Sequence, residues 1–206
     1  MTFPETKFLD IATYSDAYFK HYALASSKIN KVKLAEAATI LMNAYKNSKT
    51  LYVCGNGGSA AISNHLACDH GKLLATDTDL RPKVQSLSTN IEVITAIAND
   101  ISYDQVFVHQ LKLLANPGDV VMTVSSSGDS ENVVQAAAWA QDFGLDVISM
   151  TGFSGGRTGK IASVNLHVDS DNYGIIEDIH QSLMHLLGQY LRQSLMDENT
   201  IKEKKF

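Results

Sequence analysis

The spacing of apolar residues changes once along this chain, near residue 50. Before that point, apolar positions recur every three or four residues in FLDIATYSDAYFKHYALAS and in KVKLAEAATILMNAYK, which is the spacing of one face of an α-helix. The first fifty residues contain no glycine. We therefore expect two helices over residues 1–49, packed against each other as a hairpin and available as an oligomer contact.

After residue 49, short apolar runs rich in valine and isoleucine alternate with longer amphipathic segments. The short runs predict strands at 51–54, 84–88, 119–125, 146–151 and 165–170. The longer segments predict helices from about residue 59, at 90–100, around 103–115, at 130–143 and from about 175 into the 190s. This alternation is typical of a parallel sheet with helices on both faces, so we expect one α/β domain with its core at 50–196 and a solvated tail at 197–206.

Composition narrows the class of protein. The 206 residues are 45% hydrophobic, enough for one core, and a formal charge of −5 argues against a nucleic-acid surface. We find no apolar stretch near 18 residues and no signal-peptide pattern at the start. Cys54 and Cys68 lie among apolar neighbours, and we expect reduced thiols in the core. These features predict a soluble, cytoplasmic protein without a membrane or nucleic-acid partner.

Two of the expected strands end in loops of unusual composition. Residues 55–59 read Gly-Asn-Gly-Gly-Ser, and residues 125–130 read Ser-Ser-Ser-Gly-Asp-Ser. Backbone N–H groups freed by glycine, serine hydroxyls and the start of a helix together suit a phosphate group. The spacing fits neither a nucleotide P-loop nor a dinucleotide fingerprint. Serine also caps helices, but two such loops on strand ends favour a small phosphorylated ligand.

Histidines and carboxylates occur at helical spacing in two places. His65 and Asp69 are four residues apart, and Glu177, Gln181 and His185 follow one ridge of the last helix, with His180 beside it. Such pairs build divalent-metal sites or acid–base pairs. Single histidines on half-apolar helices are more often core residues, which is the interpretation for His70, His109 and His167. Two pairs in one chain with two phosphate-type loops favour the functional interpretation.

Several ordered motifs resemble the SIS (sugar isomerase) domain family and, within it, the phosphoheptose isomerases. They are GNGGSAA at 55–61 with His65 following, TAIAND at 95–100, PGDVVMTVSSSGDSENV at 117–133, ISMTGFSGG at 148–156 and EDIHQSLMH at 177–185. Together they cover nearly the whole chain.

The resemblance implies a flavodoxin-like sheet and a homotetramer with active sites where subunits meet. It implies isomerisation of sedoheptulose 7-phosphate to D-glycero-D-manno-heptose 7-phosphate, a precursor of bacterial surface heptose such as that of lipopolysaccharide. The family's substrate-binding positions fall on Asn56, Ser59, Asn90, Ser125, Ser126, Ser127 and Ser130. Its set for zinc, expected at one ion per subunit, and for acid–base catalysis falls on His65, Asp69, Glu177 and His185.

This chain departs from the family pattern at several of these positions. Asp69 stands where a glutamate is usual, Glu177 where a glutamine is usual, and Asn90 where an aspartate is usual, while Asp129 replaces the asparagine of the serine loop. The shorter Asp69 moves the expected base by roughly 1 Å, and the added Glu177 carboxylate strengthens a cation site. Our hypothesis is that Asp69 serves mainly as a metal ligand, while Glu177 or His185 carries more of the proton transfer.

Three alternatives stay open at this point. A replication regulator that binds the initiator DnaA is similar to these isomerases but, as the resemblance implies, lacks the acid–base pair. An isomerase of another phosphosugar would accommodate the departures just described. Generic sugar-phosphate sensing would normally accompany a DNA-binding module.

Overall fold

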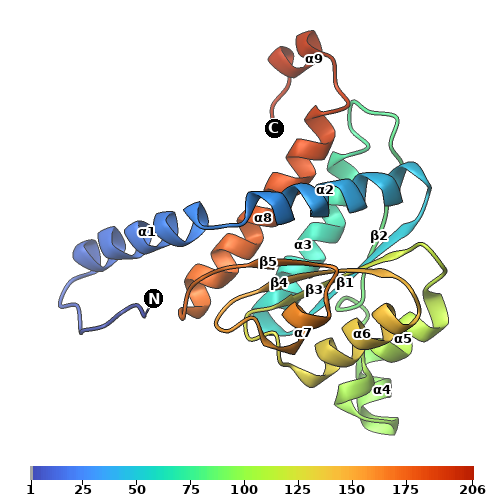
Figure 1. The fold of residues 1–206 in the computed structure, drawn as a ribbon, viewed down its shortest axis with the longest axis horizontal. Coiled ribbons are helices and arrows are strands. Elements are labelled where there is room, and N and C mark those ends of the chain that lie inside the picture. Colours follow the sequence, from blue (N-terminus) through green and yellow to red (C-terminus); the bar gives the residue numbers. More distant parts are fainter. Residues whose placement is uncertain (1) are drawn as a thin grey trace.

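A five-stranded parallel sheet forms the centre of the protein, whose computed structural model describes residues 2–206 (Figure 1). In chain order the strands are β1 (Thr50–Gly55), β2 (Lys83–Ser86), β3 (Val120–Ser125), β4 (Asp146–Thr151) and β5 (Val164–His167). Their order across the sheet is β2-β1-β3-β4-β5, with every neighbouring pair parallel. This is the flavodoxin-like order, so the expected fold class is confirmed.

Helices cover both faces of the sheet. One face carries α2 (Lys31–Lys46), α3 (Gly57–Leu73) and α8 (Tyr173–Gln193). The other carries α4 (Ile91–Asp100), α5 (Val108–Leu114), α6 (Glu131–Asp142) and α7 (Gly156–Ile161). Alternate residues of a strand supply the two cores: Val120 and Met122 of β3 face the first set of helices, whereas Val121 faces the second.

The N-terminal helices do not form the expected hairpin. The helix α1 (Ile11–Ser27) and α2 run end to end, and both contact α8 (Figure 1). Only residues 28–30 link the two helices, and Asn30 caps α2, with its Oδ1 accepting from the backbone N–H groups of Val32 and Lys33 at 3.0 and 3.1 Å. The prediction of a hairpin is wrong. The apolar faces of α1 and α2 pack against α8 and not against each other.

Four further details differ from the sequence expectations. The helix expected around 103–115 is divided into a short 3-10 turn, Tyr103–Gln105, and α5. The glycine-rich turn after β4 leads into α7, and the C-terminal tail contains α9 (Glu198–Glu203), capped by Asp197. Cys54 is buried, as expected, but Cys68 is exposed because it lies on the outer side of α3. None of the helices within residues 2–206 is long and apolar enough to cross a membrane.

Candidate functional site

The carboxyl ends of β1 and β3 meet where the strand order reverses. The two strands are neighbours, with Gly55 of β1 paired with Val124 of β3. After β1 the chain enters α3 on one face of the sheet, and after β3 it enters α6 on the other. Ligands of open α/β sheets bind in the crevice at such a point. Both loops that were selected from the sequence are therefore in the expected place.

The serine loop, residues 125–130, keeps several hydroxyl groups available. Ser125 and Ser127 brace it, their Oγ atoms accepting from the N–H groups of Gly128 and Asp129 at 3.2 Å each. The Ser126 Oγ is buried and has no hydrogen-bond partner among residues 2–206. Ser130 begins α6 but makes no side-chain capping bond. A buried hydroxyl without a partner is costly, so this loop is arranged to receive a polar ligand.

The glycine loop, residues 55–59, is held by a network of amides. Asn56 and Asn132 exchange two side-chain hydrogen bonds of 2.8 and 3.0 Å, and the Tyr103 hydroxyl donates to Asn56 Oδ1 at 2.9 Å. Ser59 is buried in the first turn of α3. The amide of Asn56 therefore has a defined orientation at the mouth of the crevice. Tyr103 and Asn132 were not selected from the sequence, since no local pattern connects them to Asn56.

Asn90 is the N-cap residue of α4. Its Oδ1 accepts from the N–H of Val93 at 3.0 Å and so caps α4. A substrate-binding role for Asn90 stays a prediction.

A cluster of two histidines and one aspartate joins α3 to α8. Asp69 Oδ2 lies 3.3 Å from His65 Nε2 and 3.4 Å from His185 Nε2. Ligand atoms about 2.1 Å from a zinc ion at tetrahedral angles are about 3.4 Å apart. Asp69 is therefore spaced from each histidine as an adjacent ligand of one divalent ion would be, and the ligand atoms of all three side chains lie within 4.8 Å of one another. The pairing of His65 and Asp69 with His185 agrees with the sequence prediction.

Gln181 closes this cluster on the side of α8. Its Nε2 is 2.8 Å from His65 Nδ1 and 3.3 Å from His185 Nε2. If the Gln181 amide N–H groups donate to His65 Nδ1 and His185 Nε2, then His185 Nε2 carries no proton and faces the Asp69 carboxylate without a hydrogen bond. If the amide is reversed and its oxygen accepts from both rings, His65 Nε2 carries no proton and is the nitrogen that faces Asp69 in this way. With both imidazoles neutral, one repulsive contact remains, and a bound cation would remove it.

Glu177 is not part of the cluster. It precedes His185 by two helical turns, which is about 12 Å along the axis. Its carboxylate lies over Gly58, where a Cβ atom would be 2.5 Å from Oε2. Burial raises the pKa of the Glu177 carboxyl, and the neighbouring charge of Asp178 adds to the rise. The structure thus brings together three of the four predicted ligands and places Glu177 beside the glycine loop.

Two other histidines are core residues. Burial lowers the pKa of His70 to about 4, and its ring nitrogens contact the Tyr45 hydroxyl and the Met184 carbonyl at 2.8 and 3.2 Å. Burial likewise lowers the pKa of His180 to about 4. Both are therefore neutral near pH 7, and neither reaches the cluster.

Comparison with known proteins bears on this geometry. A family model described as the SIS domain matches residues 17–152. The chain belongs to the SIS domain family.

Among relatives of this SIS domain, a probable phosphoheptose isomerase of Thermoplasma acidophilum is 39% identical over 171 residues, covering 82% of this chain and 93% of that protein. The phosphoheptose isomerase of Aliarcobacter butzleri is 35% identical over 162 residues, covering 79% and 85%. The solved structure of phosphoheptose isomerase GmhA from Neisseria gonorrhoeae superposes with a TM-score of 0.80 at 28% identity, covering 88% of this chain and 96% of that one. These similarities place this SIS domain among the phosphoheptose isomerases.

Proposed function

We propose that this protein is a cytoplasmic, zinc-dependent isomerase that converts sedoheptulose 7-phosphate to D-glycero-D-manno-heptose 7-phosphate. One observation carries the proposal: a phosphate-type loop with a free buried hydroxyl, Ser126, lies at the same switch point as the loop beneath Glu177. The names of the relatives agree with this reaction. A precursor of surface heptose is the expected product.

The reaction moves a proton between carbon 1 and carbon 2 through an enediol. It requires a base for the carbon-bound proton, a group that exchanges protons with the two oxygens, and stabilisation of the developing negative charge. The serine loop would hold the phosphate at the far end of the sugar, so that binding energy there positions the reacting end. A divalent ion, when bound, would supply positive charge near the carbonyl oxygen.

The different surroundings of Asp69 and Glu177 suggest different catalytic roles for the two carboxylates. Asp69 lies between two imidazoles, which suits a metal ligand with His65 and His185. Glu177 lies apart, beside the glycine loop, and its raised pKa makes it a stronger base than an ordinary glutamate. We therefore assign Glu177 as the base for the carbon-bound proton. Because His185 of the same chain is about 12 Å farther along α8, we assign proton exchange at the oxygens to the His185 of a neighbouring subunit. Asn56, Ser59 and the serine loop would bind the substrate.

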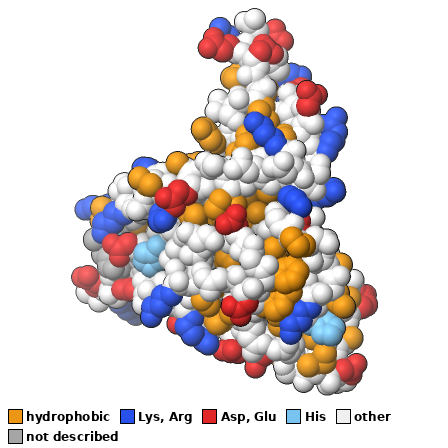
Figure 2. Space-filling model, turned by 45° about the vertical axis from the view of Figure 1, so that its right-hand side comes forward, with side chains coloured by type: hydrophobic (Ala, Val, Ile, Leu, Met, Phe, Trp, Pro, Cys, Tyr) orange, Lys and Arg blue, Asp and Glu red, His pale blue; other side chains and the backbone are white. Residues whose placement is uncertain are grey.

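The surface supports assembly into a homotetramer. Leu9, Ile11 and Phe19 in and before α1 are largely exposed, at 91%, 79% and 64%. A groove of about 480 Å³ lies between α2 and α8, with mainly apolar walls. Apolar side chains are also exposed below the projecting C-terminal segment, whose tip carries charges of both signs (Figure 2). Such surface is typical of subunit contacts, and the half-exposed cluster would then be covered by a neighbouring subunit.

An isomerase assay tests the proposal. Purified protein with sedoheptulose 7-phosphate should form the aldose, and a chelator should abolish the conversion until zinc is restored. Binding of the sugar phosphate without conversion would contradict an enzymatic role and would favour a regulator.

A further inference from the structure

The serine loop carries negative charge at the place where a phosphate is expected. Asp129 is part of the loop, and Glu131 is in the first turn of α6. The N-terminus of a helix offers roughly half a positive charge to an anion, and a single neighbouring carboxylate is enough to cancel it. Two carboxylates beside a phosphate dianion therefore need a compensating cation.

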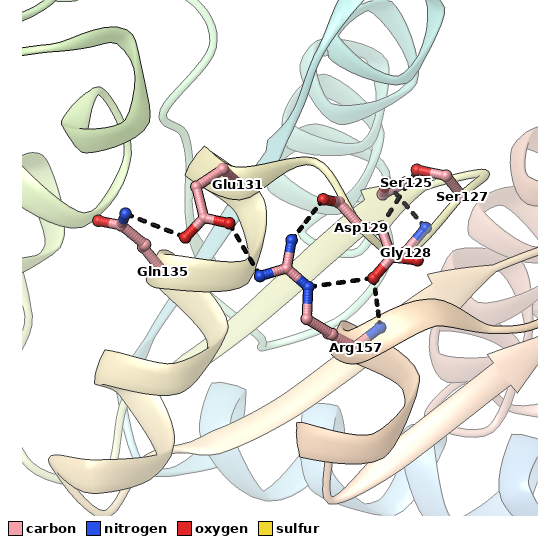
Figure 3. Close-up of polar contacts among 7 residues, drawn as sticks. All are labelled: Ser125, Ser127, Gly128, Asp129, Glu131, Gln135 and Arg157. Carbon is pink, nitrogen blue, oxygen red and sulfur yellow. Dashed lines mark hydrogen bonds and ion pairs between the residues drawn. The ribbon is translucent and has the colours of Figure 1, made fainter.

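Arg157 is this cation. It comes from α7, 28 residues after Asp129, and contacts both acids (Figure 3). Its Nε donates to Asp129 Oδ1 at 3.1 Å, its Nη2 to the Asp129 carbonyl at 2.8 Å, and its Nη1 to Glu131 Oε2 at 2.8 Å. Its backbone N–H also donates to Asp129 Oδ1, at 3.0 Å. Backbone and side-chain bonds from Arg157 keep the pKa of the Asp129 carboxyl below its usual range, so both acids are charged at neutral pH.

The same segment braces the backbone of the serine loop. The N–H of Thr158 donates to the Gly128 carbonyl at 2.9 Å, and the N–H of Gly152 donates to the Ser126 carbonyl at 2.8 Å. The side chain of Asp129 is thereby held toward α7 and Arg157. The buried hydroxyl of Ser126 is in the same loop and has no partner among the described residues.

We propose that Arg157 is a positioning residue of the phosphate subsite: it neutralises Asp129, holds it toward α7, and so allows the serine loop to accept a phosphate dianion. The inference rests on the proposed function only in assigning the subsite to a sugar phosphate. Asp129 and Arg157 form one unit, so a loop with aspartate at this position depends on the arginine. Replacing the arginine alone adds one uncompensated negative charge beside the phosphate, whereas replacing both residues restores the wild-type net charge of the loop, with Glu131 unchanged.

The expected effect is on binding rather than on the chemical step. Charges of this kind near the surface, acting on a dianion over a few ångströms, change affinity by about tenfold at low salt. Arg157→Gln should raise the KM for sedoheptulose 7-phosphate about tenfold, and added salt should reduce the difference. The kcat should stay within about twofold, because Arg157 does not contact the reacting atoms.

The test uses four proteins: wild type, Arg157→Gln, Asp129→Asn/Arg157→Gln, and Arg81→Gln as a control for the loss of one charge. Arg81 precedes β2 at the other end of the sheet, and its guanidinium donates within residues 2–206 to two nearby carbonyls, those of Thr78 and Leu80. Isothermal titration with inorganic phosphate gives affinity without any isomerisation, and thermal melting checks folding. We expect weaker phosphate binding in Arg157→Gln, recovery to within about twofold in the double variant, and no change in Arg81→Gln.

Three results would overturn the inference: wild-type affinity in Arg157→Gln, no recovery in the double variant, or a wild-type protein that does not bind inorganic phosphate. A protein that binds phosphate with this pattern but does not isomerise the sugar would leave the inference standing and refute the proposed function alone.

Discussion

Gly128 offers the sharpest test of how the serine loop is built. Its φ is +67°, and a Cβ atom there would lie 2.3 Å from the Gly155 carbonyl oxygen and 3.1 Å from the Gly156 Cα. Both neighbours are backbone atoms, which cannot move aside as a flexible side chain does. Gly128→Ala therefore adds two costs, a left-handed backbone in a residue with a side chain and a separation of two packed loops.

The magnitude follows from these two costs. The left-handed conformation costs about 1–2 kcal/mol in an ordinary residue, and forced overpacking adds about 1–3 kcal/mol. The sum is about 3 kcal/mol. In a domain of this size, each kcal/mol lowers the melting temperature by roughly 2–4 °C, so Gly128→Ala should melt about 6–12 °C below wild type.

Substitutions at two other glycines separate the cost of the backbone conformation from the cost of the steric overlap. Gly144 also has a positive φ, +79°, but a Cβ there would meet no atom within 4 Å, so Gly144→Ala should lose only the conformational part. Gly71 lies within α3 in open space, so Gly71→Ala should be neutral or should stabilise by about 0.5–1 kcal/mol. Thermal and urea unfolding measure all three variants. The reasoning is refuted if Gly128→Ala is no less stable than Gly144→Ala.

The remaining predictions concern the cluster and the buried histidines. Asp69→Asn removes the charged ligand and should lower zinc affinity at least about a hundredfold, measured by competition with a zinc chelator. Glu177→Gln should keep its zinc and lose at least about a hundredfold in turnover; loss of zinc from this variant would make Glu177 a ligand instead. His70 and His180 have pKa values lowered from 6.5 to about 4, so the unfolded state binds more protons between these values. The free energy of unfolding should therefore fall as the pH drops from 6.5 toward 4, by roughly 3 kcal/mol for each histidine, and a flat urea-unfolding profile between pH 7 and pH 5 would contradict this.

The sheet could be predicted from the sequence because its signal is local. Most of the strands are short apolar runs, and a buried parallel strand needs no partner to be recognised, as the fully buried β3 illustrates. The edge strand β2, Lys-Val-Gln-Ser, is the exception. The two loops followed from the strands, since the carboxyl ends of parallel strands share one edge. The pairing of α1 and α2 could not be predicted in this way. Periodicity shows that a helix has an apolar face and does not show which surface that face will meet.

The sequence predicted which residues belong to the candidate site better than it predicted which of them contact one another. The ridge at Glu177, Gln181 and His185 was visible as a spacing of four. Which of these meets His65 depends on how α8 packs against α3, and Gly188 sets that approach, since a Cβ there would lie 3.3 Å from the His70 ring. Gln181 therefore takes the place at the cluster that the sequence assigned to Glu177. The pairing of Arg157 with Asp129 had no local signal, because 28 residues separate the two.

Isomerisation of a phosphorylated heptose by proton transfer between two carbons can be followed directly by proton NMR of sedoheptulose 7-phosphate incubated with the zinc-loaded protein in D2O. We expect a new anomeric signal of the aldose, deuterium at its carbon 2, and loss of both in Glu177→Gln. A spectrum that stays that of the ketose, under conditions where calorimetry detects binding of the sugar phosphate, would contradict it.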